Sequence, residues 1–166
     1  MSRIIGHHGH FGIVSGGLPS GPTIFLYTVN DLEWTYLGPL FEPKPAQTPP
    51  RSPWTAHRGW NWECGSFFQL KEKSFFILGA ESTYQSILPG DQLPAKAQDR
   101  PSKWQLWFSG DLRSAEDGPK MDIEVEGVLD WGCCNYASAS NVDNKGRRLI
   151  WGELERGIAD VRLACR

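Results

Sequence analysis

The residues best suited to chemistry lie in one aromatic-rich segment of the chain. A carboxylate, Glu63, follows two tryptophans, Trp60 and Trp62, and precedes a Phe67-Phe68 strand start. Burial among aromatic rings disfavours the charged form of a carboxyl group, leaving an acid that can donate a proton near neutral pH. A glycosidic oxygen needs such a proton as it leaves, and sugar rings pack on indole faces, so the segment favours carbohydrate chemistry. The alternative is a solvated strand-end glutamate, because most glutamates are exposed.

Histidines and cysteines are the other potential ligands. His7, His8 and His10 crowd the segment 1–10, but a zinc site needs a fourth ligand and a rigid frame, which this sequence does not indicate. None of the four cysteines has CxxC spacing, and two of them are adjacent. We therefore predict a disordered start at 1–10, reduced cysteines, no metal and no cofactor, and keep a zinc site as the less favoured alternative.

Length, composition and charge exclude several classes of protein. The chain of 166 residues has the size of one domain, and its 40% hydrophobic content is ordinary for a globular protein. Lys and Arg number 17 against 19 Asp and Glu, with the signs interspersed, so no nucleic-acid footprint is visible. No segment is long and apolar enough to cross a membrane, and no secretory signal is visible. We expect a neutral small-molecule partner, and a chain that either is intracellular or lacks its true N-terminus.

Elements must hold these residues in place, and the pattern predicts that they are all strands. Short runs of β-branched and aromatic residues alternate with turn residues throughout, and eight Trp and eight Phe fit an all-β protein. We read Gly16–Pro22 as a turn, the five-proline stretch Pro43–Pro53 as a surface excursion rather than an interdomain linker, and Glu81–Pro101 as a polar loop. Strands are predicted over 11–15, 23–28, 34–37, 62–70, 74–79, 103–109, 121–126, 136–140 and 147–152.

Three of these segments carry more specific predictions. Lys103–Ser109 has aromatic residues on both faces and should be buried on both sides. A turn at Asp143–Gly146 should close a hairpin, and Glu153–Leu163 is ambiguous between helix and strand. Period two in 121–126 predicts a half-exposed edge strand, with Met121, Ile123 and Val125 inward and Asp122, Glu124 and Glu126 outward.

Repeated antiparallel strands with aromatic residues fit a radial β architecture, in which each blade is a four-stranded meander. The chain holds parts of about three blades, so we predict a single domain that is an incomplete β-propeller. Its parts would be a blade over 11–40, a blade over 62–126 that carries Glu63, and the start of another blade over 130–166.

Several segments, in matching order over roughly residues 11 to 157, together resemble glycoside hydrolase family 32, the invertase and fructan hydrolase family. That family has a five-bladed β-propeller followed by a β-sandwich, and it hydrolyses terminal β-fructofuranosyl bonds with retention. The resemblance therefore implies a saccharide partner, sucrose or a fructan. The segments that carry it are Asn61-Trp62-Glu63-Cys64-Gly65-Ser66-Phe67-Phe68, Asp130-Trp131-Gly132 with Tyr136-Ala137-Ser138, and Gly146-Arg147-Arg148-Leu149-Ile150-Trp151-Gly152, with Gly21-Pro22-Thr23 and Asp31-Leu32-Glu33-Trp34 upstream.

By this resemblance, Glu63 stands where the family has its general acid/base. The family's Glu-Cys-Pro motif here reads Glu-Cys-Gly, and glycine in place of proline would loosen the loop. Asp130 matches an Asp that contacts sugar beyond the scissile bond, although a plain turn carboxylate is the alternative. Trp60, Trp62 and Trp151 would bind substrate. Trp151 matches the first Trp of a Trp-Gly-Trp motif, whose second Trp is replaced by Glu153.

The family's nucleophile is missing from the sequence. A retaining glycosidase needs a second carboxylate about 5 Å from the first. The family supplies it from an Asn-Asp-Pro-Asn-Gly motif, and it grips the fructosyl hydroxyls with Arg-Asp-Pro; both belong upstream of Phe11, and neither occurs here. We therefore expect a truncated glycosidase with half of the catalytic pair and little or no hydrolysis by this chain alone. The alternatives are a non-catalytic propeller that binds saccharides through its tryptophans, and an inactive gene fragment.

Overall fold

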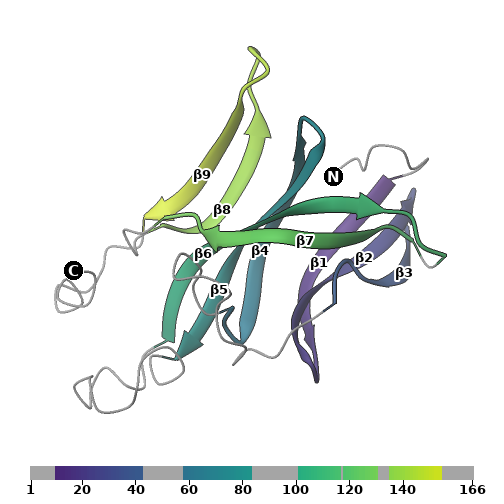
Figure 1. The fold of residues 1–166 in the computed structure, drawn as a ribbon, viewed down its shortest axis with the longest axis horizontal. Coiled ribbons are helices and arrows are strands. Elements are labelled where there is room, and N and C mark those ends of the chain that lie inside the picture. Colours follow the sequence, from purple (N-terminus) through teal and green to yellow (C-terminus); the bar gives the residue numbers. More distant parts are fainter. Residues whose placement is uncertain (1–9, 43–57, 84–100, 117, 131–134, 155–166) are drawn as a thin grey trace.

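A computed structural model describes residues 10–42, 58–83, 101–116, 118–130 and 135–154. Those residues contain nine strands and no helix, which confirms the all-β prediction. Figure 1 shows three sheets lying side by side. The strands are β1 (His10–Leu18), β2 (Gly21–Asn30), β3 (Glu33–Pro39), β4 (Asn61–Leu70), β5 (Lys73–Thr83), β6 (Pro101–Arg113), β7 (Lys120–Val128), β8 (Asn135–Val142) and β9 (Arg148–Leu154).

Every sheet is an antiparallel meander of strands that are consecutive in the chain. Their orders are β1-β2-β3, β4-β5-β6-β7 and β8-β9. The second sheet is the four-stranded unit from which a propeller blade is built. Its first strand, β4, contacts both β1 of the first sheet and β8 of the third. The strand that carries Glu63 therefore lies between the two neighbouring sheets.

Aromatic rings form the centre of the core. Trp62 of β4 and Phe108 of β6 lie with ring centroids 5.5 Å apart, and Phe41 packs against Trp62 at 5.6 Å. Phe76 of β5 is also fully buried and contacts Phe41. Such tilted ring pairs contribute roughly 0.5–1.5 kcal/mol each beyond the apolar area that they bury. They fix the second sheet against the segment that follows β3.

The turn predicted at 16–22 is wrong in extent, because Gly16 and Gly17 belong to β1 and Gly21 begins β2. Strand β1 continues to Leu18 and β2 begins at Gly21, which leaves a two-residue turn. A Cβ on Gly16 would lie 2.5 Å from the Phe25 ring. Gly16 is therefore a position of close ring approach within the strand.

The predicted faces of β7 are correct only in its first half. Strand β7 is an edge strand, as predicted, and Ile123 is half-buried. The register then shifts, since Ser109 lies opposite Val125 but Gly110 lies opposite Ile123. One extra residue in β7 reverses the alternation beyond it. Val125 is consequently 52% exposed, whereas Glu126 points inward with a side chain only 10% exposed.

Glu126 is inward because a buried cation meets it there. The Arg58 guanidinium, 6% exposed, donates a hydrogen bond to Glu126 and lies over the Phe108 ring at 5.3 Å. The Arg58 carbonyl accepts a hydrogen bond from the Trp62 indole at 2.6 Å. These contacts fasten the start of β4 to β6 and β7.

Two further predictions are confirmed. Strand β6 is buried on both faces, since Trp104, Gln105, Leu106 and Phe108 are all at most 9% exposed. The hairpin turn closes through the Gly146 amide, which donates to the Asp143 carbonyl at 3.0 Å.

The disordered start predicted at 1–10 and the polar loop predicted at Glu81–Pro101 are wrong at their ends, because His10 begins β1, β5 continues to Thr83 and β6 begins at Pro101. The remaining predictions lie outside the described residues. They concern the start at 1–9, the excursion at 43–53, residues 84–100 of the polar loop and the end of the chain from 155. In the part of the chain that is described, no helix has the length and apolarity needed to span a membrane.

Candidate functional site

A row of three polar side chains crosses the second sheet. Asn61 of β4 lies opposite Glu81 of β5, which lies opposite Lys103 of β6. Directly opposed side chains project from the same face of a sheet and are close enough to interact. The Lys103 ammonium lies 3.3 Å from Glu81 Oε1, and the Asn61 Nδ2 donates to Glu81 Oε2 at 3.0 Å.

Glu63 joins this row because it lies two residues after Asn61, just before a bulge in β4. Glu63 lies opposite Gly79 but Ser66 lies opposite Ile77, so β4 has one extra residue. Cys64, in the bulge, has a φ of 51°, a left-handed conformation that costs a non-glycine residue roughly 1–2 kcal/mol. Bulges commonly re-aim a side chain at a functional site. Here the bulge sets the register of the residues before it, so that Asn61 lies opposite Glu81 and Glu63 lies opposite Gly79.

The next residue, Gly65, has a packing reason. A Cβ on Gly65 would lie 2.6 Å from the Phe76 ring. Glycine therefore lets that core ring approach the bulge closely.

Tyr136 reaches the site from the neighbouring sheet. Its ring covers Gly79, where a Cβ would lie 2.8 Å from the ring, and it is only 5% exposed. The Tyr136 hydroxyl donates a hydrogen bond to Glu63 Oε2 at 3.1 Å. Strand β8 is also bulged just after Tyr136, where Ala137 has a φ of 51°. The tyrosine and the glutamate that it contacts thus each precede a bulge.

Five side chains from four strands form a closed network, which we call the site network: Asn61, Glu63, Glu81, Lys103 and Tyr136. Asn61 Nδ2 donates to Glu63 Oε1 at 3.0 Å as well as to Glu81. The Lys103 ammonium lies 4.7 Å from the centroid of the Tyr136 ring and closes the circle by a cation–π contact.

The site network also sets the ionisation of two of its members. Partial burial raises the pKa of Glu81, but hydrogen bonds from Asn61, Tyr136 and Lys103 outweigh it and hold that pKa below its usual value of 4.5. Burial, together with the negative charges of Glu81 and Glu63, raises the pKa of the Tyr136 phenol far above its usual value. Near neutral pH, Glu81 is therefore ionised and Tyr136 is a hydrogen-bond donor.

Trp62 does not face this site, which corrects its predicted role as a sugar-binding wall. It is 2% exposed and belongs to the core. Side chains adjacent in a strand project to opposite faces, so Trp62 and Glu63 cannot share a face. This alternation of faces could have been inferred from the sequence, because Trp62 and Glu63 are adjacent.

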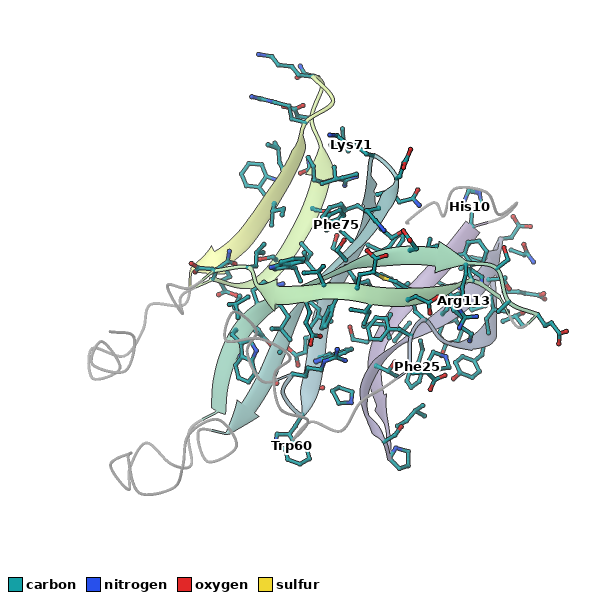
Figure 2. The ribbon with its side chains drawn as sticks, viewed as in Figure 1. His10, Phe25, Trp60, Lys71, Phe75 and Arg113 are labelled. Carbon is teal, nitrogen blue, oxygen red and sulfur yellow. The ribbon has the colours of Figure 1, made fainter. Side chains whose placement is uncertain are left out.

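The other predicted binding residues are accessible to different degrees. Trp60 is 54% exposed, and Figure 2 shows it at the opposite end of β4 from Lys71. Trp151 of β9 is 63% exposed, and its indole donates to Asn141 Oδ1 at 2.7 Å. Asp130 is half-buried, and its carboxylate accepts a hydrogen bond from the Asn135 amide at the start of β8. Contact of any of these three with sugar stays a prediction.

Asn61, Glu81, Lys103 and Tyr136 are site residues that sequence reasoning did not single out. Asn61 could have been found from period two, since it lies two residues before Glu63. Tyr136 lies in the Tyr-Ala-Ser segment of the resemblance, which implies no role for it. The polar loop predicted from Glu81 hides that residue, because β5 continues to Thr83.

The described residues contain no group of three or more His, Cys, Asp and Glu residues that could hold a metal ion. Cys64 is a free, exposed thiol. The adjacent pair Cys133-Cys134, Cys165, His7 and His8 lie outside the described residues.

Comparison with known proteins gives structural matches only. No family model and no curated protein matches the chain. A fructosyltransferase from A. japonicus matches with a TM-score of 0.61 and 25% sequence identity, over 79% of this chain and 23% of that structure. A glycoside hydrolase family 32 β-fructofuranosidase from Bombyx mori matches with a TM-score of 0.61 and 20% identity, over 89% of this chain and 28% of that structure.

A mutant of the Bombyx mori enzyme, in complex with sucrose, matches with a TM-score of 0.62 and 19% identity, over 89% of this chain and 28% of that structure. The chain thus spans between 23% and 28% of the lengths of these structures. Its fold is that of part of the propeller domain of glycoside hydrolase family 32 enzymes, and the predicted fold class is confirmed at that level.

Proposed function

We propose that Glu63 is the general acid/base of a family 32 type glycosidase, which hydrolyses terminal β-fructofuranosyl bonds of sucrose or a fructan with retention. The observation that supports this most directly is the pair of hydrogen bonds to the Glu63 carboxylate. One oxygen accepts from Asn61 and the other from Tyr136, on a bulge in a fold shared with β-fructofuranosidases. The complex of the Bombyx mori enzyme with sucrose supports the choice of substrate class.

The contacts of Glu63 suit a group that alternates between acid and base. Each carboxylate oxygen can accept two hydrogen bonds, so one donor on each leaves a lone pair where a proton can reside. In the proposed reaction, protonated Glu63 donates to the leaving glycosidic oxygen and later takes a proton from the attacking water. Asn61 and Tyr136 would hold the carboxyl group in one orientation during both steps.

None of the described residues is proposed as the nucleophile. Glu81 is near Glu63, but its carboxylate is already bound by Lys103 and Asn61. An ionised carboxylate held by a cation and a hydrogen-bond donor is a weak nucleophile. We propose that the nucleophile belongs to a part of the catalytic domain outside this sequence, and that this chain alone hydrolyses sucrose slowly or not at all.

Saccharide binding without hydrolysis is a second candidate. The exposure of Trp60, one residue before Asn61, favours it, because indole faces bind sugar rings. Trp151 and Asp130 are further proposed contacts. Trp62 is left out because the core covers it.

The test uses a ligand that needs the Glu63 charge but not the nucleophile. A five-membered iminosugar cation with the shape of fructofuranose should bind, by isothermal titration calorimetry, more tightly than sucrose. Glu63→Gln should weaken that binding roughly 10-fold or more, because a hydrogen bond to a charged group contributes about 1.5–3 kcal/mol. Glu72→Gln, at the exposed β4–β5 turn, is the matched control and should change nothing.

Sucrose hydrolysis is measured in parallel. Any turnover should disappear in Glu63→Gln and persist in Glu72→Gln. Absence of binding at millimolar sucrose and iminosugar, or turnover that survives Glu63→Gln, would refute the proposal. Tight sucrose binding that is indifferent to the charge of Glu63 would favour the binding function.

A further inference from the structure

The site network contains a second carboxylate that the proposed reaction does not consume. The Asn61 Nδ2 atom donates to one oxygen of Glu63 and one oxygen of Glu81, each 3.0 Å from the nitrogen, so those oxygens are at most 6.0 Å apart. Two carboxylates at that separation repel each other when both are ionised. The shared donors partly offset this repulsion.

The second shared donor is Tyr136, which has one proton for two acceptors. It donates to Glu63 at 3.1 Å and also hydrogen bonds with Glu81. When Glu63 is ionised, the Tyr136 phenol donates its proton in a hydrogen bond to Glu63. When Glu63 is protonated, the phenol can turn its proton to Glu81 while its oxygen accepts from the Glu63 carboxyl.

We propose that Glu81 is a positioning residue for Glu63, acting through Asn61 and Tyr136. Its carboxylate, ionised near neutral pH, accepts the hydrogen bonds that protonated Glu63 gives up, so the orientation of Glu63 is the same in both protonation states. Lys103 keeps Glu81 charged. This role rests on the proposed function, since only an acid/base must pass through both states.

The proton balance is closed within these groups. Glu63 loses its proton to the leaving oxygen and regains one from water, while Tyr136 keeps its proton throughout and only changes acceptor. Glu81 takes up no proton at any step. The network thus holds the Glu63 carboxyl group without competing with it.

Charged and titratable groups reach the surroundings of Glu63 from three other strands. They are Glu81 from β5, Lys103 from β6 and Tyr136 from β8. Glu153 lies opposite Tyr136 on β9 and is exposed. Asp130 lies five residues before Asn135 and accepts from its amide.

The experiment measures the chemical shift of the Glu63 carboxyl carbon, by NMR of protein labelled with carbon-13 at the glutamate carboxyl groups. Glu81→Gln should move this signal at neutral pH, because Asn61 and Tyr136 lose the carboxylate that they share with Glu63. Tyr136→Phe should also move it, because Glu63 loses the donor at 3.1 Å. Glu72→Gln should leave it in place.

A second variant covers the case in which Glu81→Gln fails to fold. Lys103→Met keeps both carboxylates and should raise the midpoint of Glu81, because its counter-charge is gone. An unmoved Glu63 carboxyl signal in folded Glu81→Gln, or an unmoved Glu81 titration midpoint in Lys103→Met, would overturn the inference.

The NMR measurement also separates this inference from the proposed function. A Glu63 signal that responds to Glu81→Gln, without binding of iminosugar or sucrose, would leave the coupling of the two carboxylates intact and refute the glycosidase. Binding together with a Glu63 signal that ignores Glu81→Gln would support the glycosidase and refute the role of Glu81.

Discussion

Replacing Gly79 with alanine should disturb the site without touching any of its polar groups. A Cβ at this position would lie 2.8 Å from Tyr136 Cε2, 2.9 Å from Cζ and 3.1 Å from the hydroxyl oxygen. Ordinary contact begins at 3.4 Å, so the ring must retreat by at least 0.6 Å. The ring is rigid and 5% exposed, and it cannot fold aside as a flexible side chain would.

The expected cost has two parts. Overpacking in a well-packed interior typically costs about 1–3 kcal/mol. The retreat also weakens the hydrogen bond from Tyr136 to Glu63, now 3.1 Å long, which contributes about 0.5–1.5 kcal/mol. We therefore expect Gly79→Ala to lower the free energy of unfolding by about 1.5–4.5 kcal/mol.

Urea denaturation measures the loss, and the carboxyl chemical shift of Glu63 reports the hydrogen bond. Gly17→Ala is the matched control, because a Cβ there meets its nearest atoms at 3.6 and 3.8 Å. That substitution should be neutral or stabilise the fold by up to about 1 kcal/mol through the unfolded chain. If Gly79→Ala is as stable as Gly17→Ala and the Glu63 signal does not move, the ring does not rest on Gly79 and the account of the site is refuted.

The other predictions concern the core and the charges. Arg58→Met should lower the free energy of unfolding by about 3–5 kcal/mol, because Glu126 stays buried without its partner. Adding Glu126→Leu should recover most of that free energy, as measured by urea denaturation. Equal losses in the single and double variants would contradict this. Trp62→Ala should cost about 3–5 kcal/mol, whereas Trp60→Ala should stay within about 0.5 kcal/mol, and similar urea midpoints would show that Trp62 is not in the core. Because the pKa of Glu81 is lower in the folded chain than its usual 4.5, its stabilising contribution is present above that pH and is lost as the pH falls through the folded value. Urea midpoints from pH 7 to pH 3 should therefore fall less steeply in Glu81→Gln, and parallel curves would contradict it.

Strands were predictable because each depends on neighbours in the sequence. Period-two patterns and turn residues located all nine, and the segment around Glu63 carried both a mechanism and a resemblance. Burial of β6 on both faces followed from aromatic residues at odd and even positions alike.

Register was not predictable, because bulges leave little local signal. Counting back from the turn that joins Leu70 to Lys73 would pair Asn61 with Ser82, and only the extra residue at the bulge brings Asn61 opposite Glu81. The same failure reversed Val125 and Glu126 on β7. The approach of Tyr136 joins residues 73 positions apart, and it depends on how two sheets pack.

The bulge at Cys64 makes this site more sensitive to chain length than to residue identity. Deleting one residue there would restore a regular ladder and turn over the part of β4 that precedes it, so Trp62 would emerge on the polar face and Glu63 would enter the apolar interior. Single-codon deletions in this part of β4 should therefore inactivate the site even at positions where most amino-acid substitutions are tolerated. Among distant homologues, a gap in this strand would mark chains that conserve the glutamate in sequence but not its position on the polar face.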